Sequence, residues 1–203
     1  MRMRKKKWTA AFLQEEQEYL IEDGLCIPDD QPVYLEIGMG MGDFIVESAK
    51  ENPGIFYIGL EREETCVARA VKKAREAGVE NMRILFKDAR EIDLLFKEKS
   101  IDRIYLPFSD PWPKKRNHKR RLTYPTFFEK YAKILKDDGS ILFKSDNDSL
   151  FEDTLEYLKE SPFEAVEVHE DHHSEKREEV LTAYERKFIA EGHPIHFVEM
   201  RKK

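Results

Sequence analysis

The hydrophobic and polar positions follow a repeating pattern from residue 33 onward. Short apolar runs typical of buried strands alternate with segments whose apolar residues recur at helical spacing. The pattern predicts strands at 33–37, 55–60, 82–86, 101–108, 140–144, 163–168, 182–189 and 195–200. It predicts helices at 8–21, 43–50, 63–77, 90–97, 125–136 and 149–159, a helix stop at Gly78, and turns at 137–139 and 192–194. Such alternation favours an α/β fold, a parallel sheet with helices on both faces.

The length of the chain, 203 residues, suits one α/β domain. No repeat or flexible linker divides it, so we expect a single domain over 1–203, with a basic arm and helix at 1–24 and a core at 33–203. No membrane span and no secretory signal are expected, because no apolar stretch is long enough. The isolated Cys26 and Cys66 predict a reduced, cytoplasmic protein. No protein partner is implied, and a monomer or a homodimer would both fit.

Two basic segments stand out from an otherwise acidic chain. The chain has 35 basic and 41 acidic residues, with a net charge of −6. Five of the basic residues lie in 2–7 and six in 114–121, which leaves 24 basic against 41 acidic residues elsewhere. One-sign runs are interaction elements more often than solvated faces, which usually mix both signs. We therefore expect the two basic segments to bind a polyanion in a defined orientation. The alternative is that the second segment is only a solvated loop.

The second basic segment follows the strand at 101–108 through the sequence Ser-Asp-Pro-Trp-Pro. Pro111 and Pro113 fix their own φ and push the preceding residues towards extended backbone. Asp110 and Trp112 should therefore be presented in a restricted geometry. Trp112 is either a stacking surface for a base or a residue packed on the core.

Each of the first five predicted strands ends near an acidic residue: Glu36, Glu61, Asp88, Asp110 and Asp146. Ligands of parallel sheets bind outside the carboxyl ends of the strands, so these acids should face one ligand site. The alternative is that acids such as Asp43 or Asp146 only cap their helices.

Three glycines follow the first strand at G-x-G-x-G spacing: Gly38, Gly40 and Gly42. This spacing differs from the dinucleotide fingerprint and lacks the ending of a P-loop. Flanking acids, Glu36 and Asp43, would repel a pyrophosphate but suit the amino group and sulfonium of S-adenosylmethionine. Glu61, 19 residues beyond Gly42, is then placed to accept hydrogen bonds from both ribose hydroxyls, and Asp88 from the adenine amino group.

Six motifs occur in order over nearly the whole chain: LEIGMGMG, IGLE, KDA, DPWPKKRNHKRRL, FKSDN and TAYERKF. Together they resemble the bacterial tRNA (guanine-N7)-methyltransferases, and the DPWPK segment is the specific part. The resemblance implies a Rossmann-like class I fold, a mostly parallel seven-stranded sheet with an antiparallel closing strand. It also implies methylation of guanosine 46 in the tRNA variable loop. The sequence departs from the family pattern at Ser109, Asn117 and Ser145.

The resemblance also assigns residues to the two ligands. The cofactor site would contain the three glycines with Glu36, Glu61, Asp88, Ala89 and Asp110. The substrate site would contain Lys114, His118, Arg121, Asp146, Thr182, Glu185 and, in the arm, Arg4. Asp110 is the candidate catalytic residue, although the sequence does not separate its role from that of Asp146: either could stabilise charge or select guanine.

No metal is expected in the site. His169, His172 and His173 are close in sequence, but no Cys accompanies them and their neighbours are typical of a solvated loop.

Two other functions remain as alternatives, an NAD-dependent oxidoreductase and a non-catalytic RNA-binding protein. The glycine spacing disfavours the first, and the acid at each strand end disfavours the second.

Overall fold

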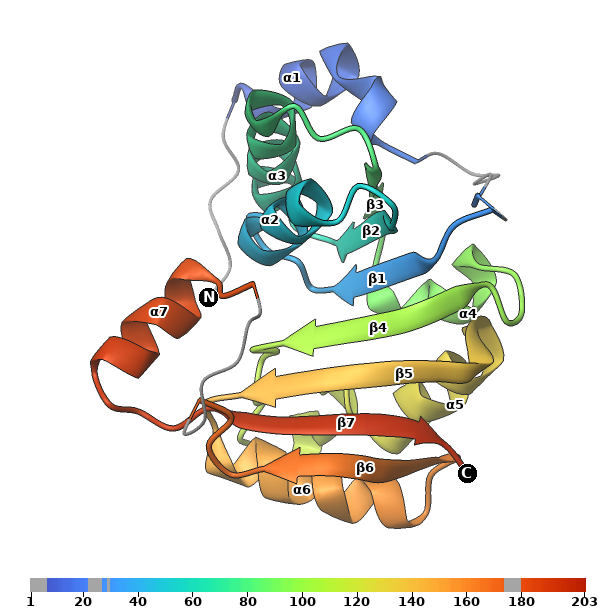
Figure 1. The fold of residues 1–203 in the computed structure, drawn as a ribbon, viewed down its shortest axis with the longest axis vertical. Helices are drawn as coiled ribbons and strands as arrows, with labels where there is room; N and C mark the ends of the chain where they lie inside the picture. Colours follow the sequence, from blue (N-terminus) through green and yellow to red (C-terminus); the bar gives the residue numbers. More distant parts are fainter. Residues whose placement is uncertain (1–6, 22–26, 29, 174–179) are drawn as a thin grey trace. The chain divides into compact units, whose positions relative to one another are not determined.

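The fold is described from a computed structural model, over residues 7–21, 27–28, 30–173 and 180–203 (Figure 1). Seven strands form one sheet in the order β3-β2-β1-β4-β5-β7-β6. The pairs β1/β2, β2/β3 and β4/β5 are parallel, whereas β7 is antiparallel to both β5 and β6. The predicted α/β fold with an antiparallel closing strand is thus confirmed. Within the described ranges, no helix is long and apolar enough to cross a membrane.

The chain divides into two compact units, Met1–Leu95 and Phe96–Lys203, which are described in turn. That residues 1–203 form one domain stays a prediction. The first unit contains α1 (Thr9–Glu15), η1 (Gln17–Tyr19), β1 (Val33–Ile37), α2 (Asp43–Glu51), β2 (Phe56–Glu61), α3 (Glu64–Ala77), β3 (Met82–Phe86), η2 (Ala89–Glu91) and α4 (Ile92–Leu95). Gly78 ends α3 in the left-handed conformation, as predicted.

The predicted helix at 8–21 is only partly helical. Only α1 and η1 within this range are helical. After η1 the chain is extended, and Leu20 forms a parallel bridge with Ile84 of β3. The N–H of Ile21 donates to the carbonyl of Ile84 at 2.9 Å. Backbone groups on an outer strand need hydrogen-bond partners, and this segment supplies one to β3.

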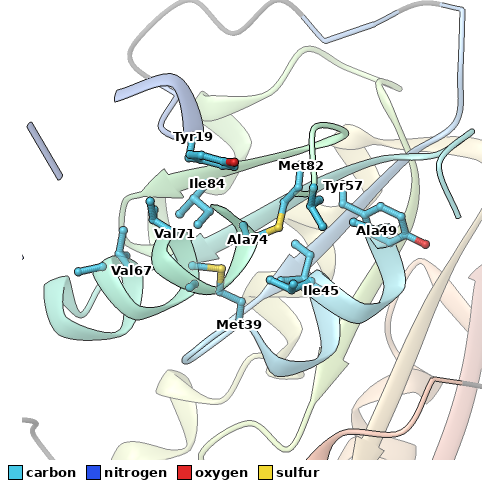
Figure 2. Close-up of a cluster of buried hydrophobic side chains, with 14 of the residues drawn as sticks. Tyr19, Met39, Ile45, Ala49, Tyr57, Val67, Val71, Ala74, Met82 and Ile84 are labelled. Atoms are coloured by element: carbon cyan, nitrogen blue, oxygen red, sulfur yellow. The ribbon is translucent and has the colours of Figure 1, made fainter. Parts of the chain in front are cut away.

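The core of the first unit lies between α3 and the strands (Figure 2). Val67, Val71 and Ala74 recur at helical spacing along α3 and belong to one buried cluster with Met82 and Ile84 of β3. Full burial of each valine, isoleucine or methionine side chain is worth about 1.5–3 kcal/mol. This packing fixes the strands whose ends hold the candidate site.

The second unit contains β4 (Ile101–Pro107), η3 (Lys115–Arg120), α5 (Pro125–Ile134), β5 (Leu135–Ser145), α6 (Asp148–Lys159), β6 (Phe163–His169), α7 (Ala183–Ala190) and β7 (His196–Lys202). Helices α5 and α6 lie behind its strands in Figure 1. The turn predicted at 137–139 lies inside β5. The pairing shifts there from Ile101–Leu135 to Arg103–Ser140, so that residues 136–139 oppose Asp102 as a bulge.

The strand predicted at 182–189 is wrong, because this segment forms helix α7. The Thr182 hydroxyl accepts from the N–H of Glu185 at 3.0 Å, and the Glu185 carboxylate accepts from the N–H of Thr182 at 2.8 Å. This capping box satisfies two N–H groups at the helix start and outweighs the strand preference of the aromatic and β-branched residues. Residues 192–194 therefore join α7 to β7 and are not a hairpin turn.

Candidate active site

The glycine loop after β1 has the conformation that only glycine adopts without strain. Gly38, Gly40 and Gly42 have φ values of 76°, 56° and 75°. The N–H of Gly38 donates to the carbonyl of Leu60 at 2.8 Å, which ties the loop to β2. A Cβ at position 42 would lie 2.8 Å from the Cβ of Ala70 on α3. Gly42 is therefore required for packing as well as for backbone geometry.

Glu61, at the end of β2, anchors this loop. One carboxylate oxygen accepts from the N–H of Gly40 at 3.0 Å, and the other accepts from the N–H groups of Arg62 and Glu63 at 2.8 and 2.9 Å. A carboxylate offers about four lone-pair positions, so capacity remains for a ligand hydroxyl. The predicted ribose acceptor is thus also a support for the glycines.

The other two acids of this unit lie at the same edge of the sheet. Glu36 pairs with Gly59 across β1 and β2 and is buried. Asp88 follows β3 and accepts from both the N–H and the guanidinium of Arg90, at 2.9–3.0 Å. These bonds hold the pKa of Asp88 below its ordinary value, so the carboxylate stays charged. Ala89, the next residue, is half-buried at the start of η2.

The alternative that Asp43 and Asp146 only cap their helices does not hold, because other residues make the caps. Asp88 caps η2, and the side chain of Asn147 caps α6. Asp43 makes no cap and pairs with Lys73 of α3, while Asp146 accepts from Tyr184. The acids at the strand ends are therefore not a set of helix caps.

In the second unit, the loop after β4 presents Asp110 to solvent. The extended backbone predicted for Trp112 is wrong, because its φ is 41°. The carbonyl of Pro111 accepts from Arg121 at 2.8 Å, which fixes the chain on one side of Trp112. The Trp112 ring is half-buried and lies under the Arg120 guanidinium, 4.9 Å from carbon to ring centroid. Trp112 is therefore neither a core residue nor an uncovered stacking face.

The basic segment forms the 3-10 helix η3 and not an irregular loop. Five of its cations are exposed: Lys114, Lys115, Arg116, Lys119 and Arg120. Arg121 is only 1% exposed and its guanidinium contacts protein, so it is not on the surface expected to meet the substrate. His118 is half-buried, with Nδ1 3.4 Å from the hydroxyl of Tyr157.

Asp146, after β5, is exposed and is held by Tyr184, which is not among the predicted site residues. The hydroxyl of Tyr184 donates to Asp146 at 2.7 Å, and the Tyr184 ring meets Phe108 edge-on at 4.8 Å between centroids. Burial, with the bond to Asp146, raises the pKa of Tyr184, so it remains a donor. The T-x-x-E spacing would have placed Tyr184 in the first turn of a helix.

Thr182 and Glu185 face inward. Thr182 is 8% and Glu185 1% exposed, and the Glu185 carboxylate also accepts from Lys144 at 2.8 Å. The predicted substrate residues therefore fix the start of α7, and with it Tyr184. Arg4 lies outside the described residues.

The histidines near the end of β6 pack against neighbouring side chains. His172 is buried and stacks on Phe197 at 4.2 Å, and His173 Nε2 lies 3.7 Å from the Glu185 carboxylate. Within the part of the chain that the structure covers, no group of three or more His, Cys, Asp or Glu residues could hold a metal ion.

Solved structures share this fold at low sequence identity. The structure of an antibiotic related methyltransferase is 17% identical, with a TM-score of 0.60 over 98% of this chain and 96% of the other. Geranyl diphosphate C-methyltransferase from Streptomyces coelicolor A3(2) is 12% identical, with a TM-score of 0.60 over 96% and 77%. The fold is that of the Rossmann-like class I methyltransferases.

Sequence relatives define the family. A family model described as putative methyltransferase matches residues 30–198. The tRNA (guanine-N(7)-)-methyltransferase of Bacillus velezensis is 41% identical over 98% of this chain and 96% of the relative. The protein of the same name from Macrococcus caseolyticus is 41% identical over 99% and 100%. The chain belongs to the tRNA (guanine-N7)-methyltransferase family.

Proposed function

We propose that this protein transfers the methyl group of S-adenosylmethionine, in line, to N7 of guanosine 46 in the variable loop of tRNA. The observation that supports this most directly is the 41% identity to a tRNA (guanine-N(7)-)-methyltransferase over 98% of the chain. The acids at the strand ends and the exposed basic segment are consistent with it. A cytoplasmic location and a monomeric or homodimeric state stay predictions.

The residues of the first unit fit the cofactor. When bound, S-adenosylmethionine supplies an electrophilic methyl group on a sulfonium, and S-adenosylhomocysteine is left. Glu61 and Asp88 would accept hydrogen bonds from the adenosine, and Glu36 would favour the cationic amino-acid end. The loop leaves room at Gly40, where an added Cβ would meet nothing within 4 Å. A carboxylate-rich, open glycine loop suits a cationic ligand with several hydroxyl and amino donors.

The residues of the second unit would hold the guanine. Its N7 lone pair is unprotonated at neutral pH, so no side chain has to act as a base. Positioning is then the main task, and well-oriented reactants can save about 7–11 kcal/mol. Asp146, held by Tyr184, would accept from the guanine N1 and N2 donors. Asp110 would stabilise the positive charge that develops on the imidazole ring.

The exposed cations would bind the RNA backbone. Lys114 and its exposed neighbours on η3 are surface side chains of one sign, the pattern expected for phosphate contacts. Arg4 and His118 are proposed as additional contacts. Thr182 and Glu185 would act through α7, by placing Tyr184 against Asp146.

Product analysis tests the proposal. Incubation with radiolabelled S-adenosylmethionine and unmodified tRNA, followed by digestion to nucleosides, should place the label in 7-methylguanosine alone. Reduction and aniline treatment should then cleave the tRNA at one site in the variable loop, and changing guanosine 46 to adenosine should abolish incorporation. Label in another nucleoside would overturn the substrate assignment. No label with any RNA would favour a non-catalytic RNA-binding protein.

A further inference from the structure

Arg121 differs from the other cations of the basic segment. All six cations at 114–121 lie within the described residues, and five of them are exposed, whereas Arg121 is 1% exposed. Its Nε donates to the carbonyl of Pro111 at 2.8 Å. Its Nη1 donates to Asp153 at 2.5 Å and to the hydroxyl of Tyr157 at 3.3 Å. The guanidinium is thus occupied by groups of the protein.

These contacts join the two ends of the loop. Pro111 precedes η3 and Arg121 follows it, while Asp153 and Tyr157 belong to α6. The same helix contacts the segment a second time, because the Tyr157 hydroxyl lies 3.4 Å from His118 Nδ1. The Tyr157 ring also meets Tyr124 edge-on at 5.4 Å, just beyond the segment. Arg121 thus links the Pro111 end of the loop to α6, and His118 and Tyr124 contact the same helix through Tyr157.

We propose that Arg121, Asp153 and Tyr157 form a clamp that positions the basic segment and Asp110 without contacting RNA. This inference rests on the proposed function, in which that segment binds tRNA. Asp153 supplies a negative charge against Arg121, and burial keeps the Arg121 guanidinium away from phosphates. Arg121 is therefore a positioning residue, and the phosphate contacts come from its exposed neighbours.

The salt dependence of tRNA binding separates a clamp from a phosphate contact. Removing one phosphate contact should reduce the slope of log affinity against log salt by about 0.7–0.9. Arg121→Gln should leave this slope unchanged, whereas Arg120→Gln, the exposed neighbour of equal charge, should reduce it. Misplaced reacting groups should lower kcat on the order of 10- to 100-fold in Arg121→Gln. Affinity for S-adenosylmethionine should fall much less than kcat, because Glu61 and Asp88 do not belong to this segment.

A second pair of variants approaches the clamp from α6. Asp153→Asn should lower kcat, as Arg121→Gln does, and should make trypsin cleave residues 114–120 faster. Glu156→Gln, one turn away on the same helix and paired with Lys159 at the surface, should change neither. If Arg121→Gln fails to fold, Tyr157→Phe removes only the two hydroxyl contacts, to Arg121 at 3.3 Å and to His118 at 3.4 Å, and should raise the trypsin cleavage rate on its own.

Two results would overturn the clamp. A reduced salt slope in Arg121→Gln would make Arg121 a phosphate contact. Unchanged kcat together with unchanged trypsin cleavage in Asp153→Asn would show that these side chains do not position the loop. Failure of the proposed function would be seen separately, as absence of methylation by the wild-type protein, because trypsin protection of the loop needs no substrate.

Discussion

The N–H of Gly40 donates a 3.0 Å hydrogen bond to the carboxylate of Glu61, so the acid that ends β2 also fixes the loop that follows β1. The two residues are 21 positions apart in sequence. A side chain proposed to bind the cofactor thereby orients a loop whose glycines are proposed to bind the same ligand. Loss of Glu61 should affect both functions together.

Glu61→Ala should therefore weaken binding of S-adenosylmethionine about 10- to 100-fold. Removal of a hydrogen bond to a charged group costs about 1.5–3 kcal/mol, and about 1.4 kcal/mol corresponds to tenfold in affinity. Calorimetric titration measures the effect, with Glu51→Ala, an exposed acid at the end of α2, as the control. EDTA should not alter activity. Wild-type affinity in Glu61→Ala would contradict the role of Glu61 in cofactor binding. Loss of activity in EDTA would show that the reaction needs a metal ion.

Two glycines of the same loop should respond differently to alanine. Gly40→Ala places a Cβ in open space but at φ 56°, which costs about 1–2 kcal/mol. Gly42→Ala adds a 2.8 Å approach to the Ala70 Cβ at φ 75°, so its loss of unfolding free energy should be clearly larger. Urea unfolding of both variants measures the difference. Equal losses of unfolding free energy would mean that the close approach to Ala70 does not add to the cost at position 42.

The Asp88–Arg90 pair predicts a dependence of stability on pH. Because the pKa of Asp88 is lowered, mainly by its hydrogen bond to Arg90, the pair stabilises the fold above the unfolded pKa of about 3.9. That contribution is lost as pH falls through the lower folded pKa. Arg90→Ala should thus be less stable than the wild type near neutral pH, and the gap should close in acid. Urea unfolding between pH 2 and 7 tests this, and a gap that is independent of pH would refute it.

Tyr184→Phe tests the support of Asp146. The change removes the 2.7 Å bond to the carboxylate but keeps the ring against Phe108. We expect kcat/KM for tRNA to fall by about tenfold or more, as for removal of a hydrogen bond to a charged group. Affinity for S-adenosylmethionine and thermal stability should stay close to wild type. An unchanged kcat/KM would mean that Asp146 does not depend on Tyr184.

Local patterns predicted the elements whose stability is local. Strands β1 and β3 have the predicted bounds because each is a short apolar run between turn residues. Helix α7 differs from the predicted strand because its capping box, Thr182 with Glu185, outweighs the strand propensity of its aromatic residues. Burial of Arg121 had no local signal, since its partners Asp153 and Tyr157 are 32 and 36 residues away. Sequence alone identified the candidate acids but not which side chains hold them.

Neutralising the exposed part of the basic segment should weaken tRNA binding through its charge alone. The variant changes Lys115, Arg116 and Arg120 to Gln, all of which are exposed on η3. Removal of each phosphate contact should flatten the salt dependence by about 0.7–0.9 in log–log slope, because fewer counterions are released on binding. Affinity for S-adenosylmethionine should stay at the wild-type value.

The matched control changes three exposed lysines elsewhere, Lys50, Lys97 and Lys159, to Gln, which alters the net charge equally. If tRNA bound through the overall charge of the protein, both triple variants would lose the same affinity. If it docks on η3, only the first should lose affinity and slope. Filter binding at several salt concentrations distinguishes the two. An unchanged slope in the η3 variant would show that the segment is a solvated surface and that tRNA binds elsewhere.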